Sequence, residues 1–213
     1  MKNKSRIKAL FLLFVLIALS LSVSGCKNPF RTRKSPEPKG QRGTWDTPVE
    51  PKVVIQNLLF AYNEKIIENF NTCISDTFAF SAPEDSIAAV NRNQPELFAR
   101  WDAGTEKRVT GSLFDFFREN SDSMDYFLFF DFDTYREDKE SDTLAIVTLN
   151  YRITIHQFKV QDKEPVEARG VATFYLKETT LNWWSVFFWL DLPDLPGGYD
   201  WAAFKAQFRE FLF

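Results

Sequence analysis

The chain has 213 residues, of which 45% are hydrophobic and 16% aromatic, so it can bury the core of one domain. Its 26 Lys and Arg residues are outnumbered by 29 Asp and Glu residues, which gives a formal net charge of −3. This acidic balance argues against nucleic acid as a partner, because binding nucleic acid needs a basic patch that replaces the counterions of phosphate.

Residues 1–25 have the pattern of an export signal. Four basic residues lie in the first eight positions, and the apolar run "ALFLLFVLIALSLSV" follows them. This run is short for a bilayer span, which needs about 20 apolar residues, and it ends in small residues that suit a signal peptidase. We therefore expect residues 1–25 to be a signal peptide.

The end of this segment, Val23, Ser24, Gly25 and Cys26, resembles the lipobox of bacterial lipoproteins. The resemblance implies that Cys26 is lipidated, with palmitate or similar acyl chains, and becomes the first residue of a membrane-anchored protein. Two or more acyl chains give stable anchoring, whereas one gives only marginal binding. Lys27 after the cysteine favours the outer membrane, facing the periplasm, although the leaflet stays open. The alternative is an ordinary secretory signal that leaves an unmodified thiol.

The next segment is rich in Pro, Gly, Lys and Arg, with six bases against three acids in residues 27–50. It buries too little apolar surface to offset the cost of ordering, so we expect residues 26–50 to form a flexible basic tether. Its bases could attract anionic headgroups or simply keep the linker solvated, and both interpretations stay open. Residues 51–213 have the size of a single domain.

Helical periodicity comes first in this domain. The stretches "EPKVVIQNLLFAYNEK" and "KIIENFNTCIS" place apolar residues three and four positions apart and predict two amphipathic helices. "DTFAFSA" predicts a short strand, and "QPELFARWD" and "TEKRVTGSLFDFFREN" predict further helices. Cys73 falls within the second helix, and we expect a small core residue there rather than a reactive thiol, because nothing basic flanks it.

From Met124 onward the apolar residues alternate, which predicts strands. In "DTLAIVTLNYRITIHQFKV", one face carries Val147 to Ile155 at every second position, and the polar face carries His156. The stretch "EARGVATFYLKE" predicts its neighbour. "TTLNWWSVFFWLDLPD" is apolar on both faces: we assign Trp184, Val186 and Phe188 to the core and Trp183, Phe187 and Trp189 to the opposite face. We expect that opposite face to need a cover.

The C-terminal stretch "DWAAFKAQFREFLF" predicts a helix from about residue 199 with the apolar stripe Trp201, Phe204, Phe208 and Phe211. This stripe could fold back over the outer face of the Trp-rich strand, because the intervening "DLPDLPGGYD" favours a reversal. Alternatively, the helix or the sheet could meet a partner protein or form a homodimer.

The order of these motifs resembles an NTF2-like (SnoaL-like) domain. "VVIQNLLFAYNEKIIENFNTCISDTFAFSAP" is similar to the opening of that family, and Trp184, Val186, Trp189 and Asp191 are similar to its closing strand. The resemblance covers most of residues 51–193. It implies an α+β fold in which N-terminal helices pack on a strongly curved antiparallel sheet and close a cone around a pocket, which in this family can bind a small apolar ligand.

The resemblance implies that an enzyme of the ketosteroid-isomerase type would need a carboxylate base and an oxyanion donor inside the cone, whereas the dehydratase members use a His-Asp pair. Asp125 and Asp131 are the candidate acids if their strand face lines the pocket, although such acids more often mark solvent. By parity His156 points out of the cone, and Asp191 is expected to be a structural partner at a strand end. A single histidine and a lipidated Cys26 leave no common zinc pattern, and no glycine-rich phosphate loop occurs, so we expect neither metal nor cofactor.

We therefore expect a membrane-anchored, non-enzymatic binding or interaction module. The alternative is a small-molecule lyase or isomerase of the ketosteroid-isomerase type that uses the cone. A carboxylate and a tyrosine that converge within hydrogen-bond reach at the pocket floor would favour the enzyme, and a pocket filled by phenylalanines would exclude catalysis.

Overall fold

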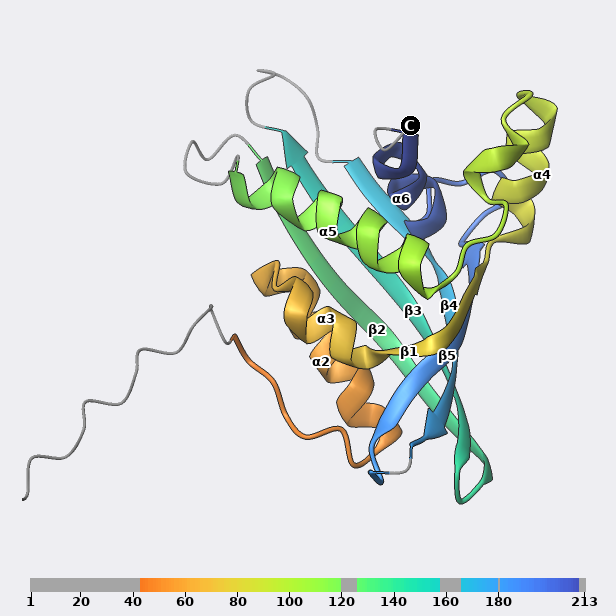
Figure 1. Ribbon diagram of the computed structural model, residues 1–213. Helices are drawn as coiled ribbons and strands as arrows, with labels where there is room; N and C mark the ends of the chain where they lie inside the picture. Colours follow the sequence, from red (N-terminus) through yellow and green to blue (C-terminus); the bar gives the residue numbers. More distant parts are fainter. Residues whose placement is uncertain (1–42, 120–125, 158–165, 180, 211–213) are drawn as a thin grey trace, which may run out of the picture. The chain divides into compact units, whose positions relative to one another are not determined.

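The computed structural model describes residues 43–119, 126–157, 166–179 and 181–210 (Figure 1). The predicted signal peptide, Cys26 and Asp125 lie outside the described residues. Within them, no helix is both long enough and apolar enough to span a membrane.

The helices occur mostly where the periodicity predicts them. They are α2 (Pro51–Glu64), α3 (Ile67–Cys73), α4 (Pro83–Asn91), the 3-10 helix η1 (Pro95–Leu97), α5 (Ala103–Glu119) and α6 (Trp201–Glu210). Helix α2 begins with Pro51, whose missing N–H costs nothing in the first turn, and ends at Lys65 in the left-handed conformation. The stretch predicted to be helical around residue 95 is reduced to η1, and α4 was not predicted.

Five strands form one sheet in the order β1-β5-β4-β3-β2. Their bounds are β1 Ile74–Ser81, β2 Tyr126–Ser141, β3 Leu144–Gln157, β4 Val166–Glu178 and β5 Trp184–Pro193. Strands β2 to β5 pair antiparallel, but β1 pairs parallel with β5. The sheet is therefore mixed rather than wholly antiparallel, because the long connection between β1 and β5 allows the parallel pairing that a tight hairpin cannot make.

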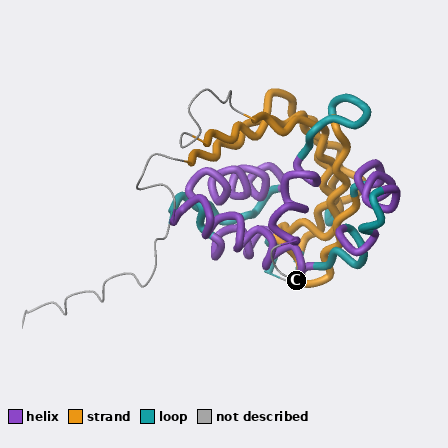
Figure 2. The backbone as a smooth tube through the Cα atoms, turned by 90° about the horizontal axis from the view of Figure 1, so that it is seen from above, coloured by secondary structure: helices purple, strands orange, loops and turns teal. Residues whose placement is uncertain are grey.

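The sheet is a curved wall, and helices α2, α3 and α5 pack on its inner side (Figures 1 and 2). The inner residues of β3 are the ones predicted from alternation: Val147, Leu149, Tyr151, Ile153 and Ile155 are all buried. Asn150 and Arg152, on the other face, are exposed. The side chain of His156 lies outside the described residues.

The face assignment within β5 is partly wrong. Leu176 pairs with Val186, whereas the adjacent Tyr175 pairs with Phe188, so Phe187 is the extra residue of a β-bulge. The bulge shifts the alternation by one position. Trp184 and Val186 point inward as predicted, but after the bulge it is Trp189 that is fully buried, while Phe188 lies on the opposite face.

Helix α6 does not cover the outer face of β5 as predicted. Its first residue, Trp201, is fully buried inside the cone, with its ring centroid 4.2 Å from that of Trp189 and 4.9 Å from that of Tyr62. The indole Nε1 of Trp201 donates a hydrogen bond to the Tyr62 hydroxyl at 2.9 Å. The helix therefore closes the cone from one end, and Phe211 lies outside the described residues.

The domain begins earlier than Pro51. Trp45 Nε1 donates to Thr72 Oγ1 at 3.1 Å, and the Asn57 side chain makes two hydrogen bonds with the backbone of Asp46. The Trp184 N–H donates to the Pro48 carbonyl at 2.7 Å. Residues 44–48, which the sequence assigned to the tether, thus form part of the packed domain because specific side chains satisfy their backbone groups.

Candidate functional site

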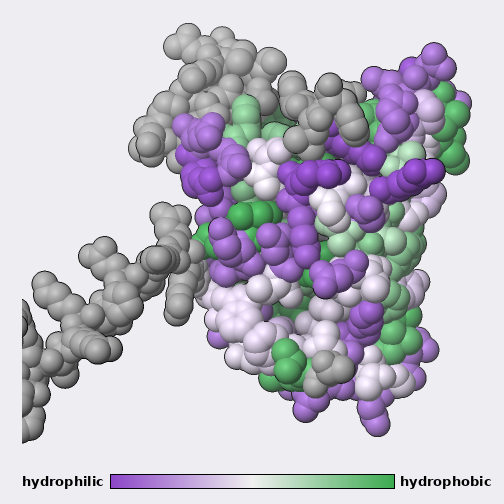
Figure 3. Space-filling model, viewed as in Figure 1, coloured by the Kyte–Doolittle hydropathy of each residue, from purple (hydrophilic) through white to green (hydrophobic). Residues whose placement is uncertain are grey.

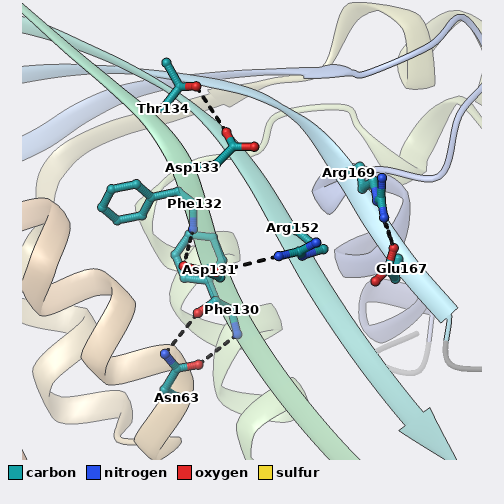
Figure 4. Close-up of polar contacts among 9 residues, drawn as sticks. All are labelled: Asn63, Phe130, Asp131, Phe132, Asp133, Thr134, Arg152, Glu167 and Arg169. Atoms are coloured by element: carbon teal, nitrogen blue, oxygen red, sulfur yellow. Dashed lines mark hydrogen bonds and ion pairs between the residues drawn. The ribbon is translucent and has the colours of Figure 1, made fainter.

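The candidate acid Asp131 lies on the outer face of the sheet, away from the cone. Its side chain is 49% exposed, and one carboxylate oxygen lies 3.8 Å from the Arg152 guanidinium (Figure 4). The other accepts the backbone N–H of Phe132 at 2.8 Å. The condition under which Asp131 would serve as a catalytic acid, a face that lines the pocket, is therefore not met.

The same close-up shows how the edge strand β2 is held (Figure 4). The Asn63 amide donates to the Phe130 carbonyl at 3.0 Å and accepts the Phe130 N–H at 2.8 Å. These bonds satisfy backbone groups that an edge strand otherwise leaves open, and they fix α2 against β2. The Asp131–Arg152 and Glu167–Arg169 pairs are partly exposed, and such pairs contribute little to stability.

A tyrosine and a carboxylate do converge inside the cone. Asp191 is fully buried, and its Oδ2 accepts hydrogen bonds from the Tyr151 hydroxyl at 3.2 Å and from the Ala202 N–H at 2.8 Å. The Tyr151 hydroxyl in turn accepts the Trp201 N–H at 2.7 Å. Gly170 on β4 makes room for this phenol, because an added Cβ would fall 2.5 Å from the Tyr151 hydroxyl oxygen.

Burial dominates the protonation of this pair. It raises the pKa of Asp191 to about 7, because the charged form loses its hydration, and it raises the pKa of Tyr151 far above its usual range. Asp191 Oδ1 has no hydrogen-bond partner among the described residues. In an open cone, such a carboxyl beside a tyrosine could exchange protons with a bound carbonyl compound near neutral pH.

A second buried network ties α6 to α5. Lys205 Nζ lies 3.1 Å from both carboxylate oxygens of Glu106, and both side chains are fully buried. Glu106 also accepts the Trp101 indole N–H at 2.7 Å and the Thr110 hydroxyl at 3.2 Å. Burial lowers the pKa of Lys205, and the charge of Glu106 opposes this shift.

Aromatic rings surround the ammonium group of this pair. Lys205 Nζ lies 3.7 Å from the ring centroid of Phe80 and 3.8 Å from that of Trp189. The negative faces of these rings attract the cation where water cannot reach it. The charged groups of Glu106 and Lys205 therefore find their partners within the protein, so the pair is structural.

The N-terminus of α6 is held by a third set of acids. Asp200 Oδ1 accepts the Ala203 N–H at 2.8 Å, as expected of an N-cap residue. Burial is also the main cause that raises the pKa of the nearby Asp85. Burial, with the neighbouring Asp191, raises the pKa of Asp200 to about 9.

Aromatic and aliphatic side chains occupy the rest of the cone. The largest fully buried side chains are Trp189, Trp201, Tyr62, Phe70, Phe114, Phe130, Phe174, Lys205, Ile55, Leu58 and Leu113. Many of these rings meet edge to face, among them Tyr62 with Phe114 at 5.0 Å between centroids. The interior is thus packed as a core, and Asp191 is sealed beneath Trp201.

A groove of about 550 Å³ lies outside the cone, between α4, η1, α6 and the loop before α6. Its wall combines apolar side chains such as Leu97 and Phe98 with polar ones such as Arg92 and Gln207. No group of three or more His, Cys, Asp or Glu residues that could hold a metal ion occurs within the described ranges.

The structure also explains the second cysteine. Cys73 is buried, and its Sγ donates to the Asn69 carbonyl at 3.4 Å. Burial raises the pKa of its thiol to about 12, so the reactive thiolate is scarce at neutral pH. Cys73 is a core residue, as the sequence predicts.

Comparison with known proteins bears on the fold alone. The sequence matches no family model, and no curated protein is significantly similar to it. A suggested scytalone dehydratase from Novosphingobium aromaticivorans superposes with a TM-score of 0.51 at 11% identity, over 68% of this chain and 81% of that one. An NTF2-like protein of unknown function in nutrient uptake from Rhodospirillum rubrum gives 0.46 at 11% identity, over 68% and 99%.

An NTF2-like superfamily protein from Salmonella enterica gives a TM-score of 0.47 at 8% identity, over 68% of this chain and 89% of that one. The domain has an NTF2-like fold, and helix α6 lies at its C-terminal end.

Proposed function

We propose that this protein is a lipid-anchored NTF2-like module of the bacterial cell envelope that acts by binding rather than by catalysis. The observation that carries the non-enzymatic part is the insertion of Trp201 into the cone, where it packs on Trp189 and Tyr62. Asp191 and Tyr151 are the pair best suited to proton transfer, but they accept hydrogen bonds from the first N–H groups of α6.

The anchor rests on the sequence. The lipobox-like Val23 to Cys26 follows a basic and then an apolar segment, in the order that lipoprotein processing needs. The chain as a whole is acidic, with 29 Asp and Glu against 26 Lys and Arg, so we propose the acyl chains, with the bases of residues 27–42 beside them, as its membrane attachment. Lys27 favours the outer membrane, facing the periplasm.

The test is fractionation of cells that express the full chain. Wild-type protein is expected in the membrane fraction, with acyl chains on its N-terminal peptide by mass spectrometry. Cys26→Ser is expected to be released or to keep its signal peptide. Cys73→Ala removes the other cysteine and is the matched control, because it leaves the lipobox intact. A mature, acylated and membrane-bound Cys26→Ser variant would refute the anchor.

The second candidate is a lyase or isomerase that uses the cone. One observation favours it: Asp191, with a pKa of about 7, lies 3.2 Å from the Tyr151 hydroxyl. This function requires α6 to withdraw in the native state. Hydrogen exchange of the Trp201 and Ala202 amides decides the matter, because exchange only through global unfolding means a closed cone, whereas much faster exchange means that α6 opens locally.

A further inference from the structure

One edge of the domain exposes an apolar surface beside the point where the chain enters it. Four side chains form this tryptophan edge: Trp45, Val49, Leu181 and Trp183. Leu181 is 70% exposed, Val49 56% and Trp183 39%. The rings of Trp45 and Trp183 meet edge to face with centroids 6.0 Å apart.

The tryptophan edge is built by two segments that are held together. The Trp184 N–H donates to the Pro48 carbonyl at 2.7 Å, which fixes the entering chain against the start of β5. Leu181 lies in the turn between β4 and β5, which the Thr179 N–H closes by donating to the Trp183 carbonyl. In Figure 3, pale and green surface gathers toward the lower left of the domain, with purple surface beside it.

We propose that the tryptophan edge seats on the surface of the lipid bilayer, an inference that rests on the proposed anchoring through Cys26. Tryptophan and leucine side chains are suited to this position, because their apolar bodies enter the interface while polar groups stay wet. The indole N–H of Trp45 donates to Thr72, so Trp45 can enter the interface without losing a hydrogen bond to water.

The length of the chain outside the structure favours this orientation. The flexible tether that the sequence predicts would place Cys26 about 20–25 Å from Gly43 on average. A folded domain of this size has a diameter of about 40 Å, so the tether is shorter than the domain is wide. The side where the chain enters, which carries Trp45, therefore faces the bilayer more often than the far side.

The charges around the edge define the kind of surface. Asp46 and Glu50 flank it and are exposed. They would be repelled by anionic headgroups, so the apolar side chains, rather than charge attraction, hold the edge to the bilayer. The expected partner is thus a zwitterionic lipid surface, with side chains entering roughly 5–10 Å into the headgroup boundary.

The test places an environment-sensitive fluorophore on the acylated full-length protein in phosphatidylcholine vesicles. Leu181→Cys reports on the tryptophan edge. The matched control is Ile87→Cys on α4, because Ile87 is 63% exposed. The native thiols do not interfere, because Cys26 is acylated and Cys73 is buried. The label at 181 is expected to shift its emission to shorter wavelengths and to be quenched by brominated acyl chains, while the label at 87 is unchanged.

Flotation of the protein with the vesicles measures the anchor, and the label measures the edge, so the two proposals fail separately. If the protein floats with the vesicles but the label at 181 emits at the same wavelength as the label at 87, the inference is overturned. Quenching of both labels alike also overturns it, because the contact would not be specific. A concentration-dependent shift at 181 in detergent, with no further change in vesicles, would show that a second copy covers the edge instead of lipid.

Discussion

The buried pair of Glu106 and Lys205 offers a quantitative test of how the cone is held. Lys205→Met keeps the apolar stem and removes the ammonium group. The Glu106 carboxylate then stays buried with only the neutral donors of Trp101 and Thr110. Removing one partner of a buried ion pair lowers the free energy of unfolding by about 3–5 kcal/mol. For a domain of this size, that loss lowers the melting temperature by roughly 6–20 °C.

The reciprocal change should cost less. Glu106→Gln keeps an acceptor for Trp101 and leaves Lys205 between the ring faces of Phe80 and Trp189, at 3.7 and 3.8 Å. Desolvated cation–π contacts contribute about 2 kcal/mol and offset part of the lost pairing. The double variant removes both charges, so it should be more stable than the sum of the single losses predicts, with a coupling energy of about 1–3 kcal/mol.

The assay is reversible urea unfolding followed by far-UV circular dichroism at neutral pH. Lys52→Met, on the exposed side of α2, is the matched control and should stay within about 0.5 kcal/mol of the wild type. A Lys205→Met variant that loses less than about 1 kcal/mol, or losses that add without coupling, would refute the reasoning.

Three further predictions follow from the closed cone and its boundary. Trp201→Ala should lower the free energy of unfolding by about 3–5 kcal/mol. Deletion of residues 199–213 should lower the melting temperature and cause aggregation at unchanged protomer mass. A stable truncated monomer formed from a dimer would contradict this. Burial raises the pKa of Asp191 to about 7. The contribution of its protonated form to folding stability is therefore fully present below about pH 4 and is lost as the pH rises through about 7. The stability of Asp191→Asn relative to wild type should thus rise by up to about 4 kcal/mol over this range, and a constant difference would contradict it. Trypsin should cut after bases of residues 27–42 and leave a core that begins near Thr44, since residues 44–48 are bonded to the domain; cleavage products that begin only after residue 50 would contradict this.

Much of the fold follows from local patterns. The alternation in β3 predicts its inner face correctly because the strand is regular and one side must be buried. The same reasoning fails in β5, where both faces are apolar and a bulge at Phe187 changes the parity. Nothing in the residue types marks that bulge, because it is the pairing with β4 that inserts the extra residue.

The interior of the cone was less predictable from the sequence. Asp191 was expected to be a structural partner at a strand end, and it does accept hydrogen bonds there, but the donors, Tyr151 and the start of α6, come from distant segments. Glu106 and Lys205 are 99 residues apart. A local signal did exist, because each of these charges lies on the apolar stripe of its helix, where a charge is buried only if it is paired. The pairing itself could not be predicted without the fold.

A buried ion pair is a poor source of net stability, so its presence here calls for another explanation. The apolar stripe of α6 could pack against the cone in more than one register, because hydrophobic contacts are not directional. Lys205 meets Glu106 in only one of them, which is the register that also brings Trp201 to Tyr62. We therefore expect the Glu106→Gln, Lys205→Met double variant to unfold cooperatively yet to lose the unique placement of α6. Near-ultraviolet circular dichroism, dominated by the buried tryptophans, should weaken and the Trp201 indole N–H should give several NMR signals. A wild-type spectrum with one sharp indole signal would show that packing alone sets the register.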